Sequence, residues 1–132
     1  MIVADSNLIA SCVLESEATE AALRLRRQDG DWAVPRLWRC EVMNIFATLT
    51  RAGRLAPGTA ERLYGPLEDA LRAGERDPSP VSVFALCEKH GITAYDAQFV
   101  ALARALGCPL YTQDKELLRK FPRLARPFYT RP

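Results

Sequence analysis

Three short apolar runs, separated by much longer helix-compatible segments, constrain the fold of this chain more than any other feature. The runs cover residues 2–4, 32–34 and 109–111. They are too short for helices and lack polar alternation, so each predicts a strand that is covered on both faces. A weaker strand is expected over 126–129, where Pro127 favours a sheet edge because proline cannot donate a hydrogen bond to a neighbouring strand.

Glycines mark the ends of the segments between these strands. Glycine readily adopts the left-handed conformation that follows the last turn of a helix. Ser79 before Pro80 marks a helix start, because serine caps a helix and proline is tolerated in its first turn. We expect helices near 17–28, 36–52, 58–73, 80–90 and 94–106, four of which are followed by Gly53, Gly74, Gly91 and Gly107.

Strands that alternate with helices pair in parallel through crossover connections. The expected fold class is therefore α/β, a three-layer α/β/α sandwich with a short, mainly parallel sheet. The 132 residues are expected to form one domain over 1–132, long enough to bury a core without disulfides or a structural metal. In such a sheet, the working crevice lies beyond the carboxyl ends of the strands.

Several classes of function are disfavoured by what the chain lacks. It has no glycine-rich phosphate loop, and its four cysteines lack the paired spacing of a zinc site, so we expect reduced and mostly packed thiols. His90 is the only histidine, and it is expected to be exposed near a helix end. A Ser-His-Asp triad is therefore disfavoured. No stretch resembles a membrane span or a signal peptide, which predicts a cytoplasmic protein with no membrane partner.

Acidic residues follow two of the predicted strands. Asp5 comes directly after the first strand, and Asp114 comes two residues after the strand that ends near Thr112. Asp96 is the last residue of a capping box that begins at Thr93. Helix capping is a sufficient explanation for each aspartate taken alone.

Glu41 is harder to explain by local structure. At about 100° per residue it shares a largely apolar face of the helix 36–52 with Leu37, Trp38 and Ile45. A buried or half-buried carboxylate left unpaired costs several kcal/mol, so a cation, a basic partner or a raised pKa must compensate. A buried salt bridge to an arginine remains the alternative to a functional role.

Together the four acids predict a concave cluster of negative charge that only a cation could stabilise. Oxygen ligands without histidine or cysteine select Mg²⁺ or Mn²⁺, and such an ion supports phosphodiester hydrolysis by activating water. We therefore interpret Asp5, Glu41, Asp96 and Asp114 as catalytic and metal-binding residues. Short polar side chains nearby either support the site or serve only in capping and packing; they are Ser6, Asn7, Asn44 and Thr112.

The charge balance is compatible with a polyanionic substrate. The formal net charge is only +2, but setting aside four of the 16 acidic residues leaves 12 against 18 basic ones. From Leu117 onward the chain has no acid, so its basic residues are expected to face none. Such a tail is either a phosphate-binding surface or only a solvated one. The residues assigned to substrate binding are Arg119, Lys120 and Arg123.

In their order and separations, four motifs resemble those of the PIN-domain family, and within it the VapC-type ribonuclease toxins of type II toxin–antitoxin systems. The resemblance spans nearly the whole chain. The matching segments are 5–7, 41–44, 93–97 and 111–114.

This resemblance implies a PIN fold and a Mg²⁺- or Mn²⁺-dependent endoribonuclease that acts on RNA. It also implies homodimerisation, inhibition by a small cognate antitoxin, and an acidic metal site at the four acids named above. Some relatives carry a further acid beside the fourth one. Glu116 either supplies that acid or is an ordinary acid in the first turn of a helix.

Two other functions stay open from the sequence. A PIN scaffold can be a non-catalytic module that binds RNA or a protein, because a fold alone does not establish catalysis. A metal-dependent nuclease acting on DNA or structured RNA is a third possibility, disfavoured by the short chain. The apolar residues of 36–52 and 58–73 either pack in the core or form a dimer or partner groove.

Overall fold

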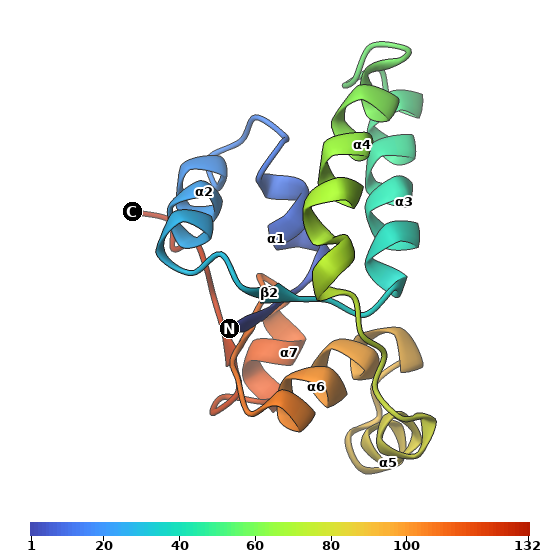
Figure 1. Cartoon of the computed structure of the whole chain (residues 1–132), viewed down its shortest axis with the longest axis vertical. Helices are drawn as coiled ribbons and strands as arrows, with labels where there is room; N and C mark the ends of the chain where they lie inside the picture. The colour runs from blue at the N-terminus through green and yellow to red at the C-terminus, as the bar shows by residue number, and fades with distance from the viewer.

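A computed structural model describes all 132 residues, Met1–Pro132, with a four-stranded sheet between two groups of helices (Figure 1). The strand order is β2-β1-β3-β4, and all three pairings are parallel. This confirms the predicted α/β class and the short parallel sheet. The strands are β1 (Ile2–Ala4), β2 (Trp32–Ala33), β3 (Leu110–Tyr111) and β4 (Ala125–Arg126).

Strand β4 lies at the sheet edge, as predicted, but of the predicted residues it includes only Arg126. It covers Ala125–Arg126 rather than 126–129. The last ladder bond runs from the Thr112 N–H to the Arg126 carbonyl at 2.9 Å. Pro127 comes next and has no N–H to offer, so pairing ends there.

The five predicted helices are all present. Two short helices follow β1 and β3, and a 3₁₀ turn follows the fourth helix. No helix has the length and apolar character needed to cross a membrane. The helices are α1 (Ser6–Ser11), α2 (Thr19–Gln28), α3 (Leu37–Arg51), α4 (Thr59–Leu71), η1 (Arg72–Gly74), α5 (Pro80–His90), α6 (Ala94–Leu106) and α7 (Lys115–Lys120).

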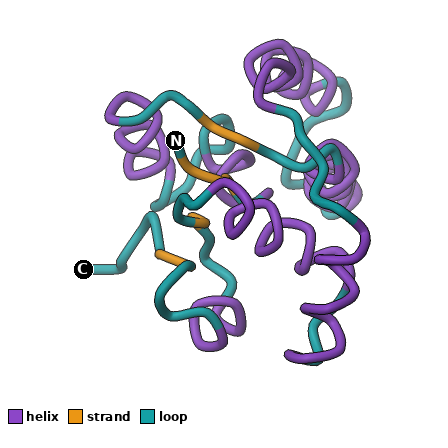
Figure 2. The backbone as a smooth tube through the Cα atoms, turned by 60° about the horizontal axis from the view of Figure 1, so that its bottom comes forward, coloured by secondary structure: helices purple, strands orange, loops and turns teal.

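The two faces of the sheet bury separate cores, because successive side chains of a strand point to opposite faces. Val3 and Leu110 pack on one side with α5, α6 and α7. Ile2 and Ala4 point the other way and pack with α1 to α4. Figures 1 and 2 show the strands between these two groups, which confirms the three-layer arrangement.

The chain leaving α4 passes close beside β2. The Val34 N–H donates to the Gly74 carbonyl at 3.0 Å, and the Arg76 N–H donates to the Val34 carbonyl at 2.9 Å. A Cβ at Gly74 would lie 2.0 Å from the Trp32 carbonyl oxygen. Only glycine therefore permits this approach.

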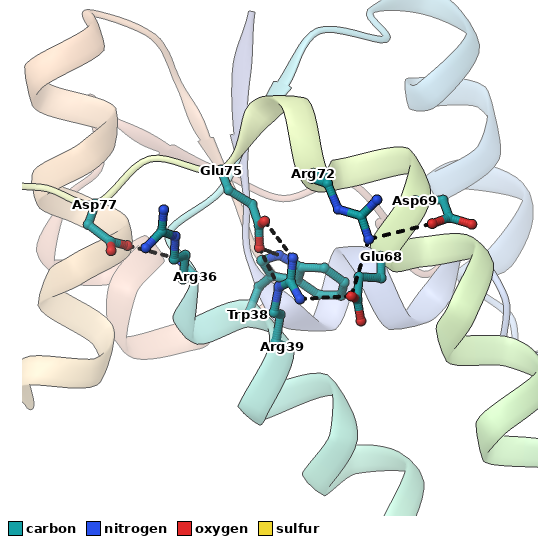
Figure 3. A network of polar contacts seen from close by, with 8 residues as sticks. All are labelled: Arg36, Trp38, Arg39, Glu68, Asp69, Arg72, Glu75 and Asp77. Carbon is teal, nitrogen blue, oxygen red and sulfur yellow. Dashed lines mark hydrogen bonds and ion pairs between the residues drawn. The ribbon is translucent and has the colours of Figure 1, made fainter.

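A polar network next to Gly74 holds the start of α3 (Figure 3). The Glu75 carboxylate accepts a hydrogen bond from Trp38 Nε1 at 2.9 Å and two from the Arg39 guanidinium at 2.6 and 2.7 Å. Arg39 also contacts Glu68 of α4 at 2.9 Å. The network orients the helix turn that carries Glu41.

The histidine and cysteine predictions are only partly correct. His90 ends α5 as expected, but it is half-buried against Phe121 with ring centroids 4.6 Å apart, and its Nε2 atom has no hydrogen-bond partner. All four cysteines are free, as expected. Cys40, in the first turn of α3, is however exposed rather than packed.

Candidate active site

A cavity of about 540 Å³ lies beyond the carboxyl ends of β1 and β3 and receives all four predicted acids. Asp5 follows β1, and Asp114 follows β3 after two residues. Glu41 comes from α3, and Asp96 comes from the first turn of α6. The fold thus brings four acids from four segments to one place.

The remaining cavity wall is neutral. It includes three of the four predicted supporting residues and four further side chains. No lysine or arginine lines it, so no cation of this chain offsets the acids there. The neutral lining residues are Ser6, Asn7, Leu37, Cys40, Asn44, Ile45 and Tyr95.

Asp5 is the buried acid of the cavity. Its Oδ1 atom accepts a hydrogen bond from the Ser6 N–H at 2.8 Å, as the cap of α1, and its Oδ2 atom accepts one from the Thr112 hydroxyl at 2.6 Å. Burial raises the pKa of Asp5 to about 6. The two hydrogen bonds oppose this change, and the charges of Glu41 and Asp96 add to it.

Thr112 joins the two acids that follow strands. It is fully buried, and besides donating to Asp5 its hydroxyl accepts a hydrogen bond from the Asp114 N–H at 3.0 Å. Asp114 caps α7, where its Oδ1 atom accepts from the N–H groups of Glu116 and Leu117 at 2.9 and 3.0 Å. Capping and a place in the cavity wall are therefore compatible at both aspartates.

Glu41 is half-buried, as its helix face predicts. Its Oε1 atom accepts a hydrogen bond from the Ser6 hydroxyl at 2.7 Å, across 35 positions in the sequence. No arginine pairs with it among the salt bridges of the chain. The salt-bridge alternative is therefore wrong, and Ser6 is the side chain that orients this carboxylate.

Asp96 is held by the start of α6. The Thr93 hydroxyl caps the helix by accepting a hydrogen bond from the Asp96 N–H at 3.1 Å, and the Asp96 carboxylate lines the cavity. Burial raises the pKa of Asp96, and the charges of Asp114, Glu41 and Glu116 raise it further. Asp96 therefore experiences the negative charge of the other acids directly.

The two predicted asparagines differ in their surroundings. The Asn7 Oδ1 atom accepts a hydrogen bond from the Gln113 N–H at 3.4 Å, which ties α1 to the end of β3. Asn44 is exposed on the cavity wall, one turn after Glu41 on α3.

Gln113 has a structural role that the sequence reasoning missed. Its Oε1 atom accepts from the N–H groups of Phe128 and Tyr129 at 2.9 and 3.1 Å, and its Nε2 atom donates to the Tyr129 carbonyl at 2.8 Å. Gln113 therefore holds the C-terminal segment against residues 112–114, which follow β3. The one available signal was its place between Thr112 and Asp114.

The basic residues assigned to substrate binding lie outside the cavity. Arg119 and Lys120 contact Glu116 at 3.8 and 3.0 Å, so the expectation that the tail faces no acid is wrong for both. The reason is helical spacing, which brings residues three and four positions apart together. Lys120 and Arg123 instead line a second cavity, together with Arg104. Glu116 does not line the acidic cavity.

The acids do not form a closed cage around one point. No three acidic, histidine or cysteine side chains lie close enough together to hold one ion by themselves. The arrangement is an open acidic wall with two carboxylates oriented by hydroxyl groups, from Thr112 and Ser6.

The chain is similar to known proteins over nearly its whole length. Residues 2–124 match the family model of the PIN domain. Ribonuclease VapC3 of Pyrobaculum aerophilum is 34% identical over 129 residues, covering 96% of this chain and 98% of that protein.

Two solved structures share the fold. The crystal structure of PAE2754 from Pyrobaculum aerophilum has a TM-score of 0.77 at 24% identity and covers 96% of this chain and 88% of that one. The crystal structure of FitAcB from Neisseria gonorrhoeae has a TM-score of 0.66 at 17% identity and covers 97% and 98%. At these identities the similarity extends to the fold alone.

Proposed function

Because the chain belongs to the PIN-domain family, we propose that it is a Mg²⁺- or Mn²⁺-dependent endoribonuclease, the toxin of a toxin–antitoxin pair. The observation that carries this proposal is the cavity lined by Asp5, Glu41, Asp96 and Asp114 with no basic residue in its wall. The similarity of the chain to a ribonuclease over nearly its whole length supports RNA as the substrate.

The donor chemistry of the cavity fits a divalent cation. All four acids offer hard oxygen ligands, which Mg²⁺ and Mn²⁺ prefer. Both hydrogen bonds that Asp114 accepts go to Oδ1, which leaves Oδ2 free for an ion. The raised pKa values of Asp5 and Asp96 reflect burial and mutual repulsion, which a bound cation would relieve.

The open spacing of the acids also fits this class of ion. Mg²⁺ retains several waters and binds through one or two carboxylates rather than a closed protein cage. Asp5 and Glu41 are the residues we assign to direct contact, because hydroxyl groups already orient both. Asp96 and Asp114 would complete the site directly or through water.

The proposed reaction is hydrolysis of an RNA phosphodiester. A bound divalent ion would activate water and stabilise negative charge on the phosphate. Water oxygen bonds to phosphorus while the bond from phosphorus to the 3′ oxygen breaks, and that oxygen takes a proton. The products carry 5′-phosphate and 3′-hydroxyl ends. Thr112 and Ser6 keep the carboxylates of Asp5 and Glu41 fixed through this step.

The test is cleavage of RNA by the purified protein and by two isosteric variants. Asp5→Asn and Asp96→Asn should lower cleavage in Mn²⁺ by at least about 100-fold, because an amide is a poor ligand for a hard cation. Asp31→Asn changes an exposed aspartate outside the cavity and should cleave like the wild type. Mapping of new 5′ ends in cells that express each protein identifies the target RNA.

The outcomes separate catalysis from binding alone. Unchanged cleavage by an Asp5→Asn, Asp96→Asn double variant would contradict the site assignment. RNA binding without turnover by the wild type would instead support a non-catalytic module.

We also propose two protein partners, an antitoxin and a second copy of the chain. Trp38, Val42, Phe46 and Leu67 are buried, so most of the apolar residues of α3 and α4 belong to the core. Met43 remains 47% exposed and lines a groove between α3 and α4. We assign the antitoxin to this groove, and sedimentation of the free protein tests the homodimer.

The basic residues beyond the cavity complete the proposal. Arg123 lines the second cavity with Arg104 and has no acidic partner. It is the one of the three predicted residues without an acidic partner, so we propose it as the phosphate contact among them. Arg119 and Lys120 share Glu116, which reduces the positive charge they present.

A further inference from the structure

An exposed aromatic ring lies on the wall of the acidic cavity. The Tyr95 side chain is 62% exposed and lines the cavity beside Asp96. It takes part in neither of the aromatic pairs of the chain. An exposed ring on the wall of a candidate active site is accessible to a flat ligand that can stack on it.

We propose that Tyr95 is a stacking platform for a nucleobase of the RNA strand bound at the four acids. This inference rests on the proposed function and extends it, because it assigns a base-binding subsite next to the scissile phosphate. The occupant is a base of single-stranded RNA, since a base paired within a duplex does not present its face to a side chain.

Charge explains why such a subsite is needed. The cavity wall holds four acids and no lysine or arginine, so it repels the phosphates of the substrate wherever a bound cation does not offset the charge. Stacking between a base and an aromatic ring does not depend on net charge, and it tolerates any sequence because every base has a π-face. Leu37 and Cys40 of α3 extend the neutral part of the same wall.

The first turn of α6 places the ring and the acid together. Thr93 caps the helix, Ala97 is fully buried, and Tyr95 and Asp96 line the cavity between them. A base on Tyr95 would therefore be held by the same rigid turn that presents the Asp96 carboxylate.

A matched control exists on the neighbouring helix. Phe84 of α5 is 61% exposed, almost the same as Tyr95, but it does not line the cavity. Removal of either ring takes a similar exposed aromatic surface from the protein. Only removal of the Tyr95 ring should change the KM for RNA.

The experiment compares Tyr95→Ala, Tyr95→Phe and Phe84→Ala on a single-stranded RNA oligonucleotide that the wild type cleaves in Mn²⁺. Tyr95→Ala should raise KM by roughly tenfold, with a smaller change in kcat, which is the order expected for loss of one stacked base. Tyr95→Phe retains the ring and should keep KM within about twofold of the wild type. Phe84→Ala should leave KM unchanged.

A second measurement separates stacking from a structural effect on Asp96. Single abasic sites are placed along the oligonucleotide, and each substrate is assayed with the wild type and with Tyr95→Ala. One abasic position should raise KM for the wild type but not for Tyr95→Ala, since the ring and the base form one interaction. Mn²⁺ affinity, measured by calorimetry, should be the same in both proteins.

Each result either supports or overturns the inference. Three results would overturn it without affecting the proposed nuclease function. They are a wild-type KM for Tyr95→Ala, an equal rise in KM for Phe84→Ala, and an abasic effect that persists in Tyr95→Ala. A wild type that cleaves no RNA would overturn the proposed function as well.

Discussion

Thr112 shows how much of the candidate site depends on one small side chain. Its hydroxyl donates to Asp5 at 2.6 Å and accepts from the Asp114 N–H at 3.0 Å, and the residue has no exposed surface. A hydroxyl can donate and accept at the same time, which few short side chains can do. A single buried oxygen thus binds the Asp5 carboxylate and the backbone of Asp114.

Thr112→Val should lower both the activity on RNA and the affinity for Mn²⁺. Valine has nearly the same shape but cannot donate to Asp5, and that bond lowers the pKa of Asp5 against the effect of burial. Loss of such a supporting bond typically costs about 10- to 100-fold in metal affinity or activity. Mn²⁺ titration by calorimetry and kcat/KM for RNA measure the effect.

Thr112→Ser is the matched control. It retains the hydroxyl and should keep most of the activity, although the lost methyl group lowers stability slightly. Full activity and Mn²⁺ affinity in Thr112→Val would show that the hydroxyl is dispensable.

Helix α3 presents Glu41, but it lacks a cap of its own. Arg36, the residue before the helix, makes no side-chain capping bond. The chain after η1 holds the start of the helix through other contacts. Asp77 accepts from the Arg36 N–H at 2.9 Å, and Glu75 holds Trp38 and Arg39 (Figure 3). Two acids distant in the sequence, Glu75 and Asp77, therefore fix the direction of α3, which carries Glu41.

Glu75→Gln should destabilise the fold, and it should do so in a pH-dependent way. The hydrogen bonds from Arg39 hold the pKa of Glu75 below its ordinary value. The stability that this carboxylate contributes is present above the ordinary glutamate pKa, and it is lost as the pH falls through the lower pKa of the folded state. Near neutral pH the change should cost about 1.5–3 kcal/mol, because the Glu75 side chain is only 7% exposed.

Urea unfolding at neutral pH and near pH 4 measures this difference, which should shrink at the lower pH. Glu20→Gln is the matched control, because it breaks a pair with Arg27 in which the side chains are 68% and 62% exposed. That variant should lose less than about 0.5 kcal/mol. Equal losses in the two variants would contradict a special role for Glu75.

The fold as a whole concentrates like charge at one edge of the sheet. Asp5, Glu41, Asp96 and Asp114 come from distant parts of the chain, and they meet only when both layers of helices pack on the sheet. Their repulsion is a cost that the folded protein bears and the unfolded chain does not. A ligand that relieves it binds the folded state selectively.

Mn²⁺ should therefore raise the melting temperature of the protein. An ion present at about 100 times its Kd stabilises the folded state by about 2.7 kcal/mol, which corresponds to a rise of several degrees. Thermal unfolding with and without Mn²⁺ measures the rise, and EDTA should reverse it. Asp5→Asn should lose most of the rise and Asp31→Asn none, so equal shifts in both variants would contradict binding at the acids.

Much of this architecture could be predicted because its causes are local. The bounds of α5 and α6 match the sequence prediction, since Ser79, Thr93 and the glycines that follow each helix act on neighbouring backbone. The strand β1 was predicted from three apolar residues that are buried on both faces. The aspartates at strand ends could be placed at one edge because parallel strands end together.

What local pattern could not supply was contact between distant segments. The Ser6 hydroxyl meets Glu41 across 35 positions, and the Thr112 hydroxyl meets Asp5 across 107. The exposure of Tyr95 likewise depends on which helices pack around α6. Helix periodicity places a residue on a face, but the packing of other elements decides what that face contacts, so partners and exposure required the tertiary structure.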